Sequence, residues 1–287
     1  MNDTIGIEQI VPRIRLMMHE LTEKEQQIVR YCLSMGKDLN QQSIQEVAGH
    51  NNVSPAMIIK VAHRCGFSGY KEMKNSLVAY SQLPVVDLHE ELNPNDDAST
   101  VVEKVFNTAI NAIEETLAII DVEAVATAAD ALKKATNIDF YGVGGSGALA
   151  LDAYHKFLRI GLRTNVCIDS HLILMSANLL REGDVALGFS HSGRTRALVE
   201  AFAFAQKKGA TTIAITNTPH SPLARYTDIL LCSVAQGSPI TGESAAARIV
   251  QLNILDALFV LVAQANYEQS LANLEMTINS VSSHRVI

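Results

Sequence analysis

Glycine and hydroxyl residues gather in two short stretches of the second half of the chain. Residues 142–147 read GVGGSG, and residues 190–195 read SHSGRT. Each stretch follows an apolar run typical of a β-strand and precedes a segment with helical periodicity, so each is expected to be a loop that opens a helix. Backbone N–H groups at a helix start, together with nearby hydroxyls, bind phosphate without a metal. The pair therefore predicts a site for a phosphorylated ligand.

The first stretch also has the spacing of a dinucleotide-binding turn. Gly142-x-Gly144-x-x-Gly147 follows a strand-like run, and Asp169 lies about where a Rossmann unit keeps its ribose-binding acid. A nicotinamide-dependent dehydrogenase would use both features. It would leave residues 190–195 and the first eighty residues without a role, so this interpretation ranks behind those that use them.

Strand-like and helical segments alternate through the second half of the chain. The alternation predicts a parallel sheet flanked by helices, a Rossmann-like or flavodoxin-like α/β fold that binds ligands at the carboxyl ends of its strands. Helices are also expected over 100–119, 122–135 and 245–263, and the last is apolar enough to belong to the core, to a subunit interface or to both. The strand-like runs begin at Asp139, Asn165, Asp184, Thr212 and Asp228.

The first eighty residues carry strong helix-start signals. Capping boxes at Thr22 and Ser43 predict a helix over 22–35 and a short one that ends near Gly49. A third helix is expected over 54–65, because it has Ser-Pro at its start and glycine just past its end. A short helix, a tight turn and a second helix form the layout of a helix-turn-helix DNA reader.

The outer face of the third helix is basic. Its apolar residues Val53, Ile58, Val61, Ala62 and Cys65 can face inward. A plain three-helix packing unit with solvated lysines would have the same spacing, so that alternative stays open. As a DNA reader, the unit would make strongly salt-dependent contacts with phosphates and base edges. The candidate contacts are Ser54, Met57, Lys60 and Arg64, with Lys71 and Lys74 on the following helix.

Composition supports a two-domain protein with one anionic partner at its N-terminal end. The net charge of −7 excludes a chain that is basic throughout, yet the first eighty residues carry slightly more basic than acidic side chains. No signal peptide or membrane span is expected, and a cytoplasmic location follows. Four dispersed cysteines suggest neither a disulfide framework nor a zinc site, and no metal or other cofactor is expected. The predicted organisation is a DNA-binding domain over 1–80, a linker over 81–99 and the α/β domain over 100–287.

The stretch GVGGSG followed by SHSGRT resembles the sugar isomerase (SIS) domain. Joined to a helix-turn-helix, it is similar to the RpiR family of bacterial phosphosugar-responsive transcription regulators, over about residues 10–265. The resemblance implies a DNA-binding regulator of sugar-catabolism genes, expected to be a repressor and not an enzyme. Its implied partners are operator DNA, a phosphorylated sugar and further copies of the chain in a homodimer or homotetramer.

The same resemblance implies roles for individual residues. His171 matches a position that contacts the sugar in relatives, and Glu243 matches the segment where catalytic SIS isomerases carry a glutamate. An aldose-ketose isomerase with Glu243 or His171 as general base is therefore the rival function, and Glu243 could also simply pair with Arg248. The phosphate is implied to bind Ser146, Ser190, Ser192 and Thr195, assisted by the backbone of Gly193 and Gly145.

Overall fold

The computed structural model describes residues 6–83, 92–235 and 245–282. Its contacts divide the chain into two compact units, Met1–Ile119 and Ile120–Ile287. Helix α6 (Ala98–Ile119) falls in the first unit, whereas the sequence assigned most of it to the α/β domain. The domain limits at 80 and 100 therefore stay a prediction, and residues 84–91 of the expected linker lie outside the described residues.

The first unit is helical and encloses its own apolar core. Both predicted capping boxes are present, at Thr22 and Ser43, so the predicted starts of α2 and α3 are confirmed. The expected inward residues of α4 also pack as predicted: Ile58, Val61, Ala62 and Cys65 are buried, and Val53 packs partly against them. Besides α6, its helices are α1 (Ile7–Met17), α2 (Glu23–Met35), α3 (Ile44–His50), α4 (Pro55–Arg64) and α5 (Tyr70–Tyr80).

Helix α1 was not predicted from the sequence. Pro12 lies inside it and is buried with Val11 and Ile14. Proline removes one helical hydrogen bond and usually ends or kinks a helix, so the local signal opposes the observed structure. The buried apolar face provides the compensation, because it packs α1 against α5 and α6.

The second unit is built on a five-stranded parallel sheet, so the predicted parallel α/β fold is confirmed. The strand order is β2-β1-β3-β4-β5. Strands β1 and β3 are neighbours, with Phe140 paired to Leu187 and Gly142 to Phe189. The loops that follow these two strands therefore leave the same edge side by side. The strands are β1 (Ile138–Gly142), β2 (Thr164–Cys167), β3 (Val185–Phe189), β4 (Thr211–Thr216) and β5 (Ile229–Cys232).

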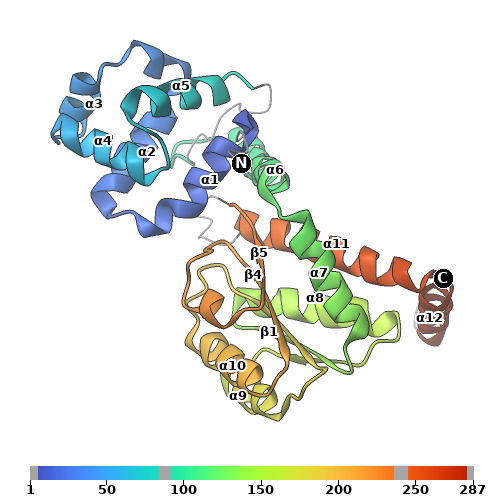
Figure 1. The fold of residues 1–287 in the computed structure, drawn as a ribbon. Coiled ribbons are helices and arrows are strands. Elements are labelled where there is room, and N and C mark those ends of the chain that lie inside the picture. The colour runs from blue at the N-terminus through green and yellow to red at the C-terminus, as the bar shows by residue number, and fades with distance from the viewer. Residues whose placement is uncertain (1–5, 84–91, 236–244, 283–287) are drawn as a thin grey trace. The chain divides into compact units, whose positions relative to one another are not determined.

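Helices cover both faces of this sheet. Figure 1 shows α9 and α10 together on one face, and α7, α8 and α11 on the other. The burial of β1 and β3 along their whole lengths agrees with a sheet covered on both sides. The helices are α7 (Val122–Lys134), α8 (Gly145–Arg159), α9 (Ser170–Leu179), α10 (Arg196–Lys207), α11 (Ala245–Ala265) and α12 (Tyr267–Ser280).

Helix α11 is the one described helix that is long and apolar enough to cross a membrane by length and composition alone. It packs on α7 and α8 and buries Val250, Ile254 and Leu258. These contacts confirm the expectation that it belongs to the domain core, and a role at a subunit interface stays a prediction.

Candidate functional site

Three of the six residues expected to contact DNA lie on the solvent-accessible side of α4. Ser54 occupies the N-cap position and is exposed, and its hydroxyl makes no capping hydrogen bond with the helix. The side chain of Lys60 is 62% exposed. Met57 is only half-buried, because part of its side chain packs against the core of the unit.

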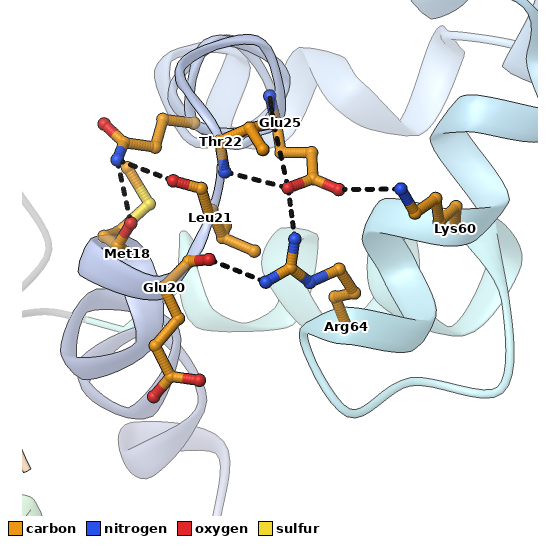
Figure 2. Close-up of polar contacts among 8 residues, drawn as sticks. Met18, Glu20, Leu21, Thr22, Glu25, Lys60 and Arg64 are labelled. Carbon is orange, nitrogen blue, oxygen red and sulfur yellow. Dashed lines mark hydrogen bonds and ion pairs between the residues drawn. The ribbon is translucent and has the colours of Figure 1, made fainter. Parts of the chain in front are cut away.

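Arg64 lies differently from the outward position that the sequence suggested. Its guanidinium forms an ion pair with the carboxylate of Glu25 on α2, and its Nη2 donates to the carbonyl oxygen of Glu20 at 2.6 Å (Figure 2). Lys60 Nζ approaches the other oxygen of Glu25 at 3.4 Å. A buried carboxylate requires such partners, so Arg64 is held against α2 and Lys60 is held loosely.

Glu25 has two roles in this cluster. Its carboxylate accepts the backbone N–H of Thr22 at 2.9 Å and so completes the capping box of α2, while it also binds the two basic side chains of α4. Burial favours its neutral form. The hydrogen bonds from the Thr22 backbone, from Arg64 and from the Thr22 hydroxyl outweigh burial and lower the pKa of Glu25 to about 2. The carboxylate is therefore charged at neutral pH.

The two lysines of α5 lie in different surroundings. Lys71 is exposed. Lys74 donates to the carbonyl oxygens of Asn40 at 3.2 Å and Gln42 at 3.3 Å, and its Nζ lies 5.8 Å from the centre of the Tyr70 ring. Lys74 thus anchors the turn that precedes α3.

In the second unit, the glycine-rich stretch forms the turn from β1 into α8. Gly144 has a φ of +60° and leads into the helix, which starts at Gly145. A side chain at Gly142 would collide with the backbone of Ser146, because a Cβ there would lie 2.2 Å from its carbonyl oxygen. The turn is therefore tight and places Gly145 and Ser146 in the first turn of α8, as expected for an anion-binding loop.

The second stretch forms a loop between β3 and α10 that its own hydroxyls shape. Ser190 is buried, and its Oγ accepts the backbone N–H of Gly193 at 3.1 Å and lies 3.4 Å from Thr195 Oγ1. Ser192 Oγ accepts the N–H of Arg194 at 3.3 Å. Thr195 is the N-cap residue of α10 and makes no capping hydrogen bond with its side chain. The structure thus brings four of the expected phosphate ligands into one loop beside the first.

The residues expected near the sugar are less fully placed. Asp169, the ribose-binding acid of the dehydrogenase interpretation, caps α9 by accepting the N–H groups of His171 at 2.9 Å and Leu172 at 3.1 Å. The side chain of His171 is 85% exposed in the first turn of α9. Glu243 lies outside the described residues.

A buried polar cluster fixes α9, and with it His171. Asp139 on β1 accepts hydrogen bonds from Asn137 at 2.7 Å, from Tyr141 at 3.0 Å and from Ser176 of α9. Burial and the nearby carboxylate raise the pKa of Tyr141, so its hydroxyl stays a donor. A carboxylate with three donors is a stable buried anchor.

Two residues at these sites were missed by sequence reasoning. Ile59 on α4 is 41% exposed beside Lys60, although an isoleucine in a helix is normally read as core. Arg248 on α11 brings its guanidinium to Gly145. A local pattern could not indicate the second contact, because it depends on how α11 packs against α8.

The fold and these two sites define a helix-turn-helix protein with a sugar-isomerase-type α/β domain. Two family models match the chain: the helix-turn-helix domain of the rpiR family over residues 8–83, and the SIS domain over 131–261. The HTH-type transcriptional regulator RpiR of Escherichia coli strain K12 is 41% identical over 268 residues, which span 93% of this chain and 90% of that protein. The chain belongs to the RpiR family of HTH-type transcriptional regulators.

Solved structures agree with this assignment. The Vibrio vulnificus NanR protein complexed with ManNAc-6P matches 97% of this chain and 100% of its own, with a TM-score of 0.62 and 24% identity, and so supports the fold. The sugar isomerase domain of an RpiR transcription factor from Sphaerobacter thermophilus matches 62% of this chain and 98% of its own, with a TM-score of 0.58 and 26% identity.

Proposed function

We propose that this regulator represses sugar-catabolism genes and releases its operator when a phosphorylated sugar binds the α/β domain. The observation that carries the proposal is the pair of hydroxyl-rich and glycine-rich loops on adjacent strands β1 and β3. A phosphate monoester needs several donors at once, and these loops offer both hydroxyls and helix-start N–H groups. The NanR complex with ManNAc-6P supports the same ligand class.

At this site, the phosphate binds the hydroxyls of Ser146, Ser190, Ser192 and Thr195 and the backbone N–H of Gly145. It also accepts the N–H of Gly193, which in its absence donates to Ser190 Oγ. His171 and Glu243 contact the sugar portion. Operator DNA binds the exposed face of α4, with Ser54 and Met57 near base edges and Lys60 on phosphate. Lys71 contacts the DNA backbone. Because Arg64 and Lys74 already hold neighbouring segments, they support this surface more than they contact DNA.

The regulatory step is a coupling between two binding sites. The chain acts as a homodimer or homotetramer in the cytoplasm, so that two copies of α4 reach the two halves of a palindromic operator. Sugar phosphate prefers one arrangement of the assembly and DNA prefers another, so each ligand weakens the binding of the other. No catalysis is needed for this response.

An aldose-ketose isomerase is the second candidate. His171 is exposed near the same loops, and a general base there could move a proton next to a carbonyl. The helix-turn-helix favours the regulator, because an isomerase has no use for it.

The test is fluorescence anisotropy of the full-length chain on labelled DNA from upstream of its own gene and neighbouring genes. The DNA complex is then titrated with ManNAc-6P and a panel of pentose and hexose phosphates, each beside its unphosphorylated sugar. Release by one sugar phosphate and not by its parent sugar is the expected result. No specific DNA binding, together with turnover of a sugar phosphate, would replace the regulator with the isomerase.

A further inference from the structure

One face of α11 lies against the carboxyl edge of the sheet, where the two loops are. Gln251 on this helix is buried, and its Nε2 donates to Oδ1 of Asn217 at 3.2 Å. Asn217 directly follows β4, and its backbone N–H donates to the carbonyl oxygen of His191 in the second loop at 3.0 Å. Arg248 precedes Gln251 by one helical turn, so it shares this face.

The Arg248 guanidinium lies at the start of the first loop's helix. A Cβ placed on Gly145, the first residue of α8, would be 2.7 Å from Arg248 Nη1. The N-terminus of a helix carries the positive end of its dipole and exposes N–H donors, which favours anions and opposes a cation. None of the ion pairs among the described residues includes Arg248. An anion between the guanidinium and the helix start would satisfy both.

A second, independent feature of this edge also indicates a ligand. The side chain of Asn217 is buried, and its Oδ1 accepts hydrogen bonds from both Ser233 at 2.8 Å and Gln251. Its Nδ2 is fully enclosed and has no hydrogen-bond partner among the described residues. Because buried donors are normally paired, a donor without a partner beside two anion-binding loops points to a group that binds there.

We infer that α11 adds a cationic side to the proposed phosphate site, with Arg248 binding the phosphoryl oxygens of the effector beside the first loop. The inference deepens the proposed function and rests on it. The loops supply hydroxyl and N–H donors that any tetrahedral oxyanion could use. The planar guanidinium adds a positive charge with paired donors, so it makes the site prefer a doubly charged phosphate ester over a singly charged ester of the same sugar.

The test measures Arg248→Gln and Arg248→Lys in the full-length chain by isothermal titration calorimetry. The probes are the sugar phosphate from the panel that binds the unaltered chain most tightly, and the sulfate ester of the same sugar. Arg181→Gln is the matched control, because Arg181 is exposed just before β3, at the opposite edge of the sheet. Urea midpoints of all four proteins separate binding effects from unfolding.

We expect Arg248→Gln to weaken the phosphate ester at least 10-fold and to reduce the preference for phosphate over sulfate, with Arg248→Lys intermediate and Arg181→Gln unchanged. Equal losses for both esters would mean that Arg248 only shapes the loop, and would overturn the inference. Unchanged binding in Arg248→Gln would overturn it as well, while the proposed function would stand. If the unaltered chain binds no sugar phosphate, the proposed function fails, and the inference fails with it.

Discussion

The guanidinium of Arg64, on the helix proposed to enter DNA, binds the carboxylate of Glu25, which belongs to the capping box that starts α2. The two residues are 39 positions apart, and the Glu25 side chain has no exposed surface. The orientation of α4 relative to α2 is therefore fixed by charge as well as by apolar packing. The proposed DNA-binding surface of α4 therefore depends on a contact that does not itself lie on that surface.

Replacement of Arg64 by Gln should destabilise the first unit by about 2 kcal/mol. Removal of one partner of a buried ion pair costs about 3–5 kcal/mol, and the side chain of Arg64 is 35% exposed, which reduces that cost. Urea unfolding followed by circular dichroism measures the effect. Arg30→Gln is the control, because Arg30 binds Gln26 on an exposed part of α2 and its loss should change stability by less than about 0.5 kcal/mol. If both variants lost the same amount of stability, the ion pair between Arg64 and Glu25 would not be what stabilises the first unit.

The low pKa of Glu25 predicts a specific loss of stability in acid. Its pKa is about 2 in the folded chain and about 4.3 when unfolded. The stabilisation is fully present above the unfolded pKa. It is lost as pH falls from the unfolded pKa through the folded pKa, because in that range the unfolded state binds a proton that the folded state does not. Glu25→Gln should therefore lower stability at pH 7 and show a weaker fall between pH 5 and pH 3. Parallel pH profiles for both proteins would contradict this account.

Lys60→Gln should weaken operator binding with little effect on folding. The side chain is 62% exposed and lies 3.4 Å from Glu25, so it can move to a phosphate at small cost. A plot of log K for operator binding against log salt concentration has a negative slope. Loss of one phosphate contact makes this slope less steep by about 1 for each bound recognition helix. Anisotropy at several salt concentrations measures the slope. Lys134→Gln on α7, whose side chain is 73% exposed, should leave it unchanged.

Gly193→Ala should abolish tight effector binding while DNA binding persists. Gly193 has a φ of +60°, and a Cβ there would lie 2.1 Å from Ser221 Oγ, so the loop must shift. An affinity loss of more than about 10-fold is expected, because the loop supplies several phosphate donors. Gly209→Ala is the matched control: its φ is +80°, but a Cβ would meet only Glu182 at 3.6 Å. If both variants lose effector affinity equally, backbone strain alone explains the loss.

Features that depend on near neighbours in the chain were predictable. The helix starts at Thr22 and Ser43 follow from side chains three residues away, and the strands follow from short apolar runs between helical segments. The position of both loops at one edge of the sheet followed from parallel α/β topology. The direct adjacency of β1 and β3 did not, because it depends on the strand order.

Contacts between distant elements were not predictable in the same way. The Arg64–Glu25 pair was hidden because Glu25 already has a sufficient local explanation in its capping box. Arg248 reaches Gly145 only after α11 has packed on the sheet, and Pro12 gave a misleading helix-breaking signal inside α1. In each case tertiary packing decided between options that the local sequence left open.

The double use of Glu25 restricts how this chain can change over time. Gln at position 25 would keep the hydrogen bond to the Thr22 backbone but would offer Arg64 no charge. Asp would keep the charge, but its shorter side chain would reach the Thr22 backbone and Arg64 less well than Glu25 does. A tolerated substitution at position 25 must therefore be accompanied by a change at the cap, at position 64 or at both, according to which contact it loses. In an alignment of descendants, these three positions should vary together.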